Sequence, residues 1–200
     1  MIENLFRSKR LILASASPRR NELLRSLGVP FERLEVEYSE PIPKSGSPGE
    51  IAVSLALSKA DEIRHLVKPD DIFITADTIV WCENRILNKP GDRDEAFEML
   101  RFLSGKTHMV LTGVCLLSNT SVTSFFSETL VTFRELKDLE IEYYIDNFNP
   151  YDKAGSYGIQ EWIGYIGVEF IEGSYYNVMG LPVQKLYTEL INFLNNNITE

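Results

Sequence analysis

The chain has 200 residues, of which 44% are hydrophobic and 24% are charged, as is typical of a soluble globular protein with one domain. Its net charge of −9 argues against a nucleic-acid-coating protein, because such proteins carry basic patches. No stretch approaches the ~20 apolar residues of a membrane span, so we expect a cytoplasmic protein. Cys82 and Cys115 lack the spacing of a metal site and favour reduced thiols.

The first predicted strand, 11–14, leads directly into a helix with an unusual charge. Ser17 is suited to cap this helix and Pro18 to be its first residue. Arg19 and Arg20 then lie in the first turn, where the helix dipole favours acidic residues. A bound anion would reverse this cost, because the free N–H groups, the dipole and both guanidinium groups would point toward it. The segment therefore predicts a phosphate site, with solvated surface arginines as the alternative.

Strand-like and helix-like patterns alternate along the rest of the chain, which favours a mixed α/β fold. Besides the first strand, the predicted strands are 31–38, 72–76, 79–82, 85–87, 107–117, 122–134 and 166–171. The predicted helices are 18–27, 48–67, 92–103, 138–148 and 182–194. Residues 1–200 are expected to form a single domain with two lobes, the second contributed by roughly residues 30–150.

Lys59 lies in the middle of an apolar stripe on its predicted helix. At about 100° per residue, Ala52, Leu55, Ile63 and Leu66 fall on the same side of the helix. A lysine in such a stripe is costly unless its ammonium group meets an anion. The alternative is a side chain that extends along the helix to reach solvent.

Asp77 directly follows the apolar run 72–76. A carboxylate just past the C-terminal end of a buried strand lies where α/β sheets bind ligands. It could hold a metal ion or act as a general base, whereas a turn aspartate that caps local backbone is the alternative. Glu40, in a proline-rich loop, could share the same cation.

Two further candidates lie in loops. Lys89 is held in an extended conformation by Pro90, and Gln160 ends the segment 152–160, which contains two glycines. That composition suits a loop that faces a ligand, and a glutamine amide can both donate to and accept from the edge of a base. Ordinary solvated loop residues are the alternative reading of both.

Taken in order, these stretches resemble the Maf nucleoside triphosphate pyrophosphatases. The matching segments are LASASPRR at 13–20, ADTIV at 76–80, LNKP at 87–90, LSGKTH at 103–108, DKAGSYGIQ at 152–160 and GSYYNVMGLP at 173–182. Each motif alone is weak, but the ordered set spans nearly the whole chain and is therefore specific.

The resemblance implies hydrolysis of a nucleoside triphosphate to the monophosphate and pyrophosphate, with a divalent metal that is usually Mg²⁺, Mn²⁺ being the second choice. It implies a fold similar to the inosine triphosphatases, an elongated mixed sheet with helices and two lobes around a central cleft. It also implies a cytoplasmic protein, often a homodimer, that acts on nucleotide pools. Because members have been linked to inhibition of septum formation, a division regulator that acts through protein partners is the alternative.

The resemblance also assigns roles residue by residue. Asp77 falls on the proton-acceptor position and, with Glu40, on the expected metal site. Lys59 and Lys89 fall on positions associated with phosphate handling.

The expected specificity residues are Arg19, Thr78 and Gln160, which match the dTTP/UTP branch and differ from the 7-methyl-GTP branch. Ser15 and Ser17, in the first motif, are expected to contact the substrate as well. A uracil or thymine edge offers carbonyl acceptors around one N–H, which an amide can complement. We therefore expect dTTP and UTP as substrates, with modified pyrimidine triphosphates as further candidates.

Overall fold

The computed structural model describes residues 9–36 and 46–198, and the chain divides into two compact units. Unit 1 holds the described residues up to Asp77 together with 112–127 and the C-terminal stretch from Gly180. Unit 2 holds 78–111 and 128–179. The predicted arrangement of two lobes around a cleft stays a prediction, as does the homodimer.

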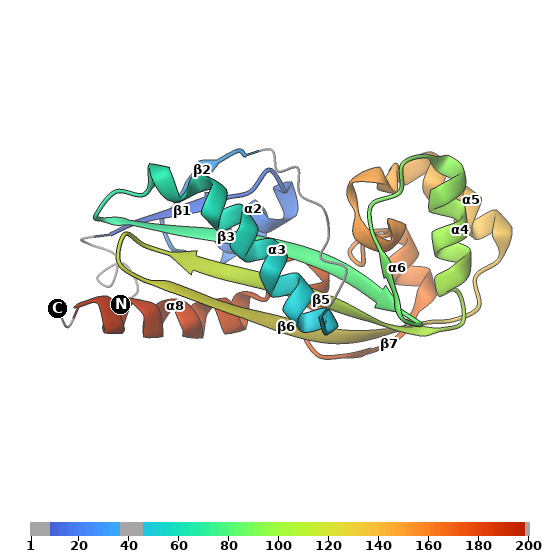
Figure 1. Ribbon diagram of the computed structural model, residues 1–200. Helices are drawn as coiled ribbons and strands as arrows, with labels where there is room; N and C mark the ends of the chain where they lie inside the picture. The colour runs from blue at the N-terminus through green and yellow to red at the C-terminus, as the bar shows by residue number, and fades with distance from the viewer. Residues whose placement is uncertain (1–8, 37–45, 199–200) are drawn as a thin grey trace. The chain divides into compact units, whose positions relative to one another are not determined.

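Within the described residues, seven strands pair in one sheet in the order β2–β1–β3–β5–β6–β7, with β4 paired to β3 (Figure 1). β1 runs parallel to β2 and β3, whereas β4 and β7 run antiparallel to β3 and β6. The strands are β1 (Arg10–Ala14), β2 (Glu32–Leu34), β3 (Asp71–Cys82), β4 (Arg85–Leu87), β5 (Thr107–Leu117), β6 (Val122–Phe133) and β7 (Val168–Glu172). The sheet is thus mixed, as predicted for an α/β fold.

Local capping signals set the starts of three predicted helices. Ser17 and Asp92 each accept a hydrogen bond from the backbone N–H three residues later, and Ser47 forms a reciprocal capping box with Glu50. The α-helices are α2 (Pro18–Ser26), α3 (Pro48–Ile63), α4 (Arg93–Leu103), α5 (Asp138–Phe148), α6 (Trp162–Gly167), α7 (Tyr175–Met179) and α8 (Val183–Ile198). Three short 3₁₀ turns follow α3 and α5, at Arg64–Leu66, Pro150–Asp152 and Ala154–Ser156.

The core of unit 1 forms where α3 packs on the strands. Small and branched side chains of α3 meet apolar residues of three neighbouring strands, and burial of this surface stabilises the unit. The buried members of this cluster are Ile12, Ala14, Ala56, Ala60, Ile63, Phe73, Cys115 and Leu117. Leu66, which was predicted on the same apolar stripe, is 43% exposed because the α-helix has already given way to a 3₁₀ turn.

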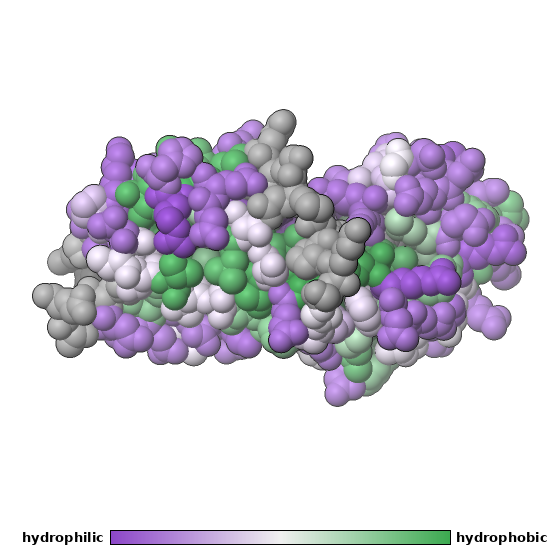
Figure 2. All heavy atoms as spheres, in the orientation of Figure 1, coloured by the Kyte–Doolittle hydropathy of each residue, from purple (hydrophilic) through white to green (hydrophobic). Residues whose placement is uncertain are grey.

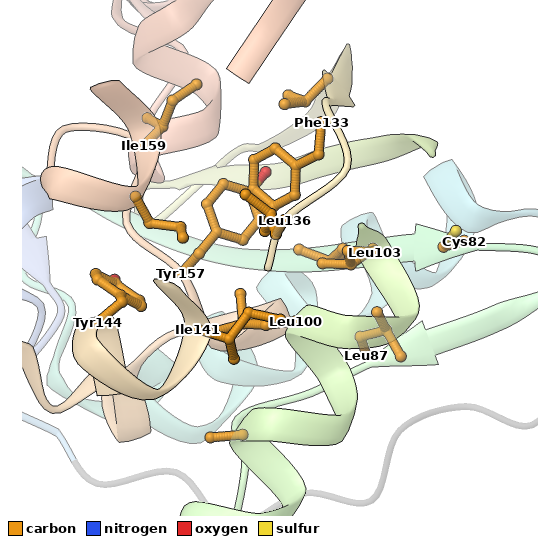
Figure 3. Close-up of a cluster of buried hydrophobic side chains, with 14 of the residues drawn as sticks. Cys82, Leu87, Leu100, Leu103, Phe133, Leu136, Ile141, Tyr144, Tyr157 and Ile159 are labelled. Atoms are coloured by element: carbon orange, nitrogen blue, oxygen red, sulfur yellow. The ribbon is translucent and has the colours of Figure 1, made fainter. Parts of the chain in front are cut away.

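The core of unit 2 is a larger cluster, to which α4, α5 and α6 contribute (Figure 3). Tyr144 and Tyr157 belong to this cluster, together with leucine and isoleucine side chains from the helices. Phe133 and Tyr157 pack edge to face with their ring centroids 4.9 Å apart.

Several predicted boundaries differ from the structure. The two predicted strands 72–76 and 79–82 are one strand, β3. The predicted strand 31–38 is reduced among described residues to Glu32–Leu34, and the predicted strand 166–171 begins at Val168. The helices α6 and α7 were not predicted, because each is at most six residues long and gives little periodicity.

On the face shown in Figure 2, hydrophilic residues predominate over α4 and α5, in keeping with the charged composition. In the part of the chain that the structure describes, no helix is both long and apolar enough to cross a bilayer.

Candidate active site

The turn from β1 into α2 gathers the serines of the first motif. Ser15 is buried, and its Oγ accepts hydrogen bonds from the Ser17 backbone N–H at 3.2 Å and from Arg20 Nη1 at 3.4 Å. Ser17 caps α2 by accepting from the Arg20 N–H. No acidic residue lies in the first turn of α2. The positive end of the helix therefore lacks a carboxylate from its own first turn to offset it.

Of the two arginines in this turn, Arg20 is the one that lies beside Asp77. Its Nη2 is 3.9 Å from Asp77 Oδ1, its Nε donates to the Gly180 carbonyl at 2.8 Å, and its side chain is only 11% exposed. The sequence carried a signal for this, because Leu23 and Leu24 follow Arg20 at the i+3 and i+4 positions of the buried helix face. Arg19 lies half-buried one position earlier on the helix.

Lys59 meets Asp77, which is the anion that its position on an apolar stripe required. Lys59 Nζ lies 3.1 Å from Asp77 Oδ1, and the two side chains are 18% and 26% exposed. A second contact aligns the same elements, because Thr75 Oγ1 donates to the Ala56 carbonyl at 2.7 Å. Thr75 and Asp77 are two residues apart on β3 and so share one face of the strand. Ala56 and Lys59 are three residues apart on α3 and so share one face of the helix.

A glycine on β5 allows α3 to approach the sheet this closely. A Cβ added to Gly113 would overlap the Ala52 carbonyl group and lie 2.7 Å from the Val53 nitrogen. Both neighbours are helix backbone, which cannot turn aside as a flexible side chain could. Gly113 therefore allows a short distance between α3 and the strands, and this distance lets the Lys59 ammonium group contact Asp77.

The predicted position of Asp77 beyond a strand end is wrong in its local detail. Asp77 lies within β3, because the β-branched residues Thr78, Ile79 and Val80 continue the extended backbone past it. The neighbouring β1 does end at this level, since it terminates at Ala14 after Leu13 pairs with Ile74. Asp77 thus lies just past the carboxyl end of the adjacent parallel strand, where such sheets bind ligands.

The predicted metal site is described in part. Glu40 lies outside the described residues, and within them no group of three or more His, Cys, Asp or Glu side chains is placed to hold a metal ion. Among the described residues, Lys59 and Arg20 both form their ion pairs with Asp77 through Oδ1. Its second oxygen, Oδ2, is a hard donor of the kind that Mg²⁺ prefers, and substrate phosphates commonly supply the remaining ligands of such an ion. The donor chemistry of Asp77 therefore fits a divalent cation.

The remaining candidates lie in unit 2. Thr78 is half-buried on β3, and Lys89 is exposed after β4. The carbonyl of Asn88, next to Lys89, accepts a hydrogen bond from the Gly155 N–H at 3.1 Å, which ties β4 to the loop that ends at Gln160. Gln160 is half-buried, and its Oε1 is buried with no hydrogen-bond partner in the described part of the chain.

The loop before Gln160 is held in an unusual conformation by buried contacts. Ser156 is fully buried with φ of +63°, a region that residues other than glycine seldom adopt, and such backbone clusters at functional sites. Lys153 is also buried, and its Nζ pairs with Asp152 at 2.7 Å and with Glu161 at 3.1 Å. Sequence reasoning missed Glu161 because a single carboxylate after the motif carries no periodic or spacing signal.

Comparison with known proteins gives the family. A protein of Phocaeicola vulgatus named dTTP/UTP pyrophosphatase is 54% identical to this chain over 191 residues, which cover 95% of this chain and 98% of that protein. Proteins of the same name from Parabacteroides distasonis and Porphyromonas gingivalis are 51% and 48% identical to this chain. The matches cover 96% and 98% of this chain, respectively, and the full length of both proteins.

A solved structure titled as a nucleoside-triphosphatase or dITP/XTP pyrophosphatase, from Mycobacterium abscessus, matches 96% of this chain and all of that chain. Its sequence identity is 14% and its TM-score is 0.39, a likeness too low to bear on fold or function. Residues 10–193 match the family described as Maf-like protein. The chain therefore belongs to the Maf family.

Proposed function

We propose that this protein is a nucleoside triphosphate pyrophosphatase that hydrolyses dTTP and UTP to the monophosphate and pyrophosphate with the help of a divalent cation, Mg²⁺ or Mn²⁺. The observation that carries this proposal is the cluster around Asp77. One carboxylate oxygen lies 3.1 Å from Lys59 Nζ and 3.9 Å from Arg20 Nη2, at the positive end of α2. The names of relatives at 48–54% identity support the same activity.

In the proposed reaction the cations of unit 1 bind the triphosphate. Arg20 and Lys59 exchange their contacts with Asp77 for phosphate oxygens, and the N-terminal end of α2 adds its positive potential. Ser15 fixes the Arg20 guanidinium and so orients its donors. A guanidinium offers two parallel donors to phosphate, whereas the Lys59 ammonium acts as a point charge.

Asp77 is the proposed general base. Its carboxylate accepts a proton from the attacking water as the anhydride bond between the α and β phosphates breaks, and pyrophosphate leaves. A bound divalent cation supplies charge stabilisation to the phosphate oxygens, and Asp77 and Glu40 are its proposed protein ligands.

Base recognition is proposed for unit 2. The Gln160 amide complements the N–H and a carbonyl of uracil or thymine. Its Oε1 is buried and has no hydrogen-bond partner among the described residues, which supports this role because such an atom is costly until a ligand donor reaches it. Thr78 and Arg19 are proposed to assist specificity, and Lys89 to contact phosphate. We place the reaction in the cytoplasm, where nucleoside triphosphates are made and consumed.

The test is a panel of dTTP, UTP, CTP, GTP and ATP with MgCl₂, in which monophosphate and pyrophosphate are both quantified. We expect the highest kcat/KM with dTTP and UTP. Asp77→Asn should reduce pyrophosphate release by at least about a hundredfold, the lower end of what a general base contributes. Asp70→Asn is the matched control, because Asp70 is an exposed carboxylate of the same unit.

Turnover of Asp77→Asn at the wild-type rate would overturn the assignment of the base. A division regulator that acts through protein partners would instead keep its cellular effect in Asp77→Asn.

A further inference from the structure

A buried hydrogen-bond chain in unit 2 fixes the backbone on both sides of Gln160. The Tyr144 hydroxyl, on α5, accepts a hydrogen bond from the Gly158 N–H at 3.0 Å and donates one to Glu161 Oε2. Glu161 Oε1 lies 3.1 Å from Lys153 Nζ. These hydrogen bonds thus hold Gly158, two positions before Gln160, and Glu161, directly after it.

The chemistry of the groups fixes which one donates and which one accepts in each of these hydrogen bonds. A tyrosine hydroxyl has a single proton, and here it goes to a carboxylate, which can only accept when ionised. Burial, reinforced by Glu161, raises the pKa of Tyr144, so the hydroxyl keeps its proton. Its remaining capacity is to accept, and the Gly158 N–H uses it. Removal of the hydroxyl would leave a buried backbone donor without this partner, which is costly.

The side chains of Gln160 and Glu161 both lie close to the Cα of Gly158, on the side where a side chain would project. A Cβ built on Gly158 would lie 2.9 Å from Glu161 Oε2 and 3.0 Å from Gln160 Nε2. The carboxylate and the amide nitrogen are therefore both close to the same point. A carboxylate only accepts hydrogen bonds, so it favours the NH₂ end of a nearby amide over the C=O end.

The orientation of this amide matters for the proposed substrate. Uracil presents an N–H between two carbonyl oxygens, whereas cytosine presents a ring nitrogen acceptor beside an amino donor. A glutamine amide that turns end for end exchanges its donor and acceptor, so a freely turning amide serves cytosine as well as uracil. Discrimination against cytosine therefore needs a group that fixes the amide.

We propose that Tyr144 and Glu161 are positioning residues that fix the Gln160 amide and so set selectivity for UTP over CTP. This inference rests on the proposed function, in which Gln160 contacts the base. Neither residue needs to touch the substrate, because Tyr144 holds the Glu161 carboxylate and the carboxylate orients the amide.

The experiment compares wild type, Tyr144→Phe, Gln160→Ala and the double variant by kcat/KM for UTP and for CTP. Loss of one hydrogen bond at Tyr144 should lower the UTP-to-CTP ratio by about three- to tenfold. In the Gln160→Ala background the same change should leave the ratio within about twofold, because the group it orients is gone. Tyr143→Phe is the matched control, since Tyr143 is the adjacent tyrosine on α5 and is 50% exposed.

Hydrogen exchange of the Gly158 amide gives a readout that does not depend on activity. We expect Tyr144→Phe to exchange faster there and Tyr143→Phe to match wild type. Glu161→Gln serves as a second variant if Tyr144→Phe fails to fold, and it should lower the same ratio.

An equal loss for UTP and CTP in Tyr144→Phe, or a full additional loss in the Gln160→Ala background, would overturn the inference. So would unchanged exchange of the Gly158 amide. A wild-type protein that releases no pyrophosphate from any nucleotide would overturn the proposed function, and the exchange data would still report whether Tyr144 holds Gly158.

Discussion

The buried His108 should make the folded protein less stable as the pH falls below about 6.5, because the unfolded chain then binds a proton that the folded protein does not. His108 is buried on β5, with Nε2 2.7 Å from the Tyr157 hydroxyl and its ring edge to face with Phe133. Burial lowers the pKa of His108 from its ordinary 6.5 to about 4, although the Lys106 backbone favours the protonated form. The unfolded chain therefore binds this proton at a higher pH than the folded protein does. The contribution of neutral, buried His108 to the free energy of unfolding is therefore fully present above pH 6.5 and is lost as the pH falls toward 4.

The magnitude follows from the two pKa values. At pH 5 the unfolded histidine is almost fully charged while the folded one is mostly neutral, so proton linkage costs about 2 kcal/mol of stability relative to pH 7. Urea unfolding at pH 7 and pH 5 measures this loss. Comparison with His108→Gln removes the contribution of the carboxyl groups, which titrate in both proteins.

We expect wild type to lose about 2 kcal/mol more than His108→Gln between these pH values. His65→Gln should behave as wild type, because His65 is exposed in a 3₁₀ turn. If His108→Gln and wild type lose the same free energy of unfolding, the reasoning from burial is refuted.

Four further outcomes are expected. Gly113→Ala should lower the free energy of unfolding by about 3 kcal/mol, because the added methyl overlaps the Ala52 carbonyl. Gly28→Ala should cost only about 1–2 kcal/mol in the same urea titration, because it meets no atom within 4 Å and strains only a φ of +69°. Arg20→Ala should lower kcat/KM more than Arg19→Ala, and equal losses would contradict the geometry around Asp77. EDTA should abolish pyrophosphate release and added Mg²⁺ restore it, whereas full activity in EDTA would exclude the proposed cation.

Signals that are local in the sequence predicted the elements well. Ser17, Ser47 and Asp92 each mark a helix start by a side chain that accepts from the backbone three residues later, which depends on no distant contact. The turn at Glu83 and Asn84 joins β3 to β4 as predicted, with positive φ at both residues.

Contacts between distant segments could not be predicted in this way. The apolar stripe around Lys59 required an anion without identifying it, because Asp77 reaches Lys59 only through the packing of α3 on the sheet. That packing depends on the hydrogen bond from Thr75 to Ala56 and on the missing side chain at Gly113. The polar residues at 77 and 78 interrupt the apolar pattern of β3, so one long strand was predicted as two.

The choice between the two arginines was within reach of the sequence. Arg20 lies on the same helix face as the buried Leu23 and Leu24, whereas the family resemblance assigned the specificity role to Arg19. Helix periodicity, applied to charged as well as apolar residues, would have favoured the inward-facing arginine.

The ion pairs of Asp77 bear on how the protein behaves between substrates. Lys59 and Arg20 would repel each other if nothing negative stood between them, and Asp77 occupies that place in the resting molecule. In the proposed reaction, an incoming phosphate group must displace the Asp77 carboxylate, so the attraction of each cation to phosphate is partly offset by the loss of its ion pair with Asp77. After the proposed reaction, the Asp77 carboxylate competes with the product for the same two cations. Under the proposed mechanism, Asp77 pairs again with Lys59 and Arg20, which favours the release of pyrophosphate and limits inhibition by the product.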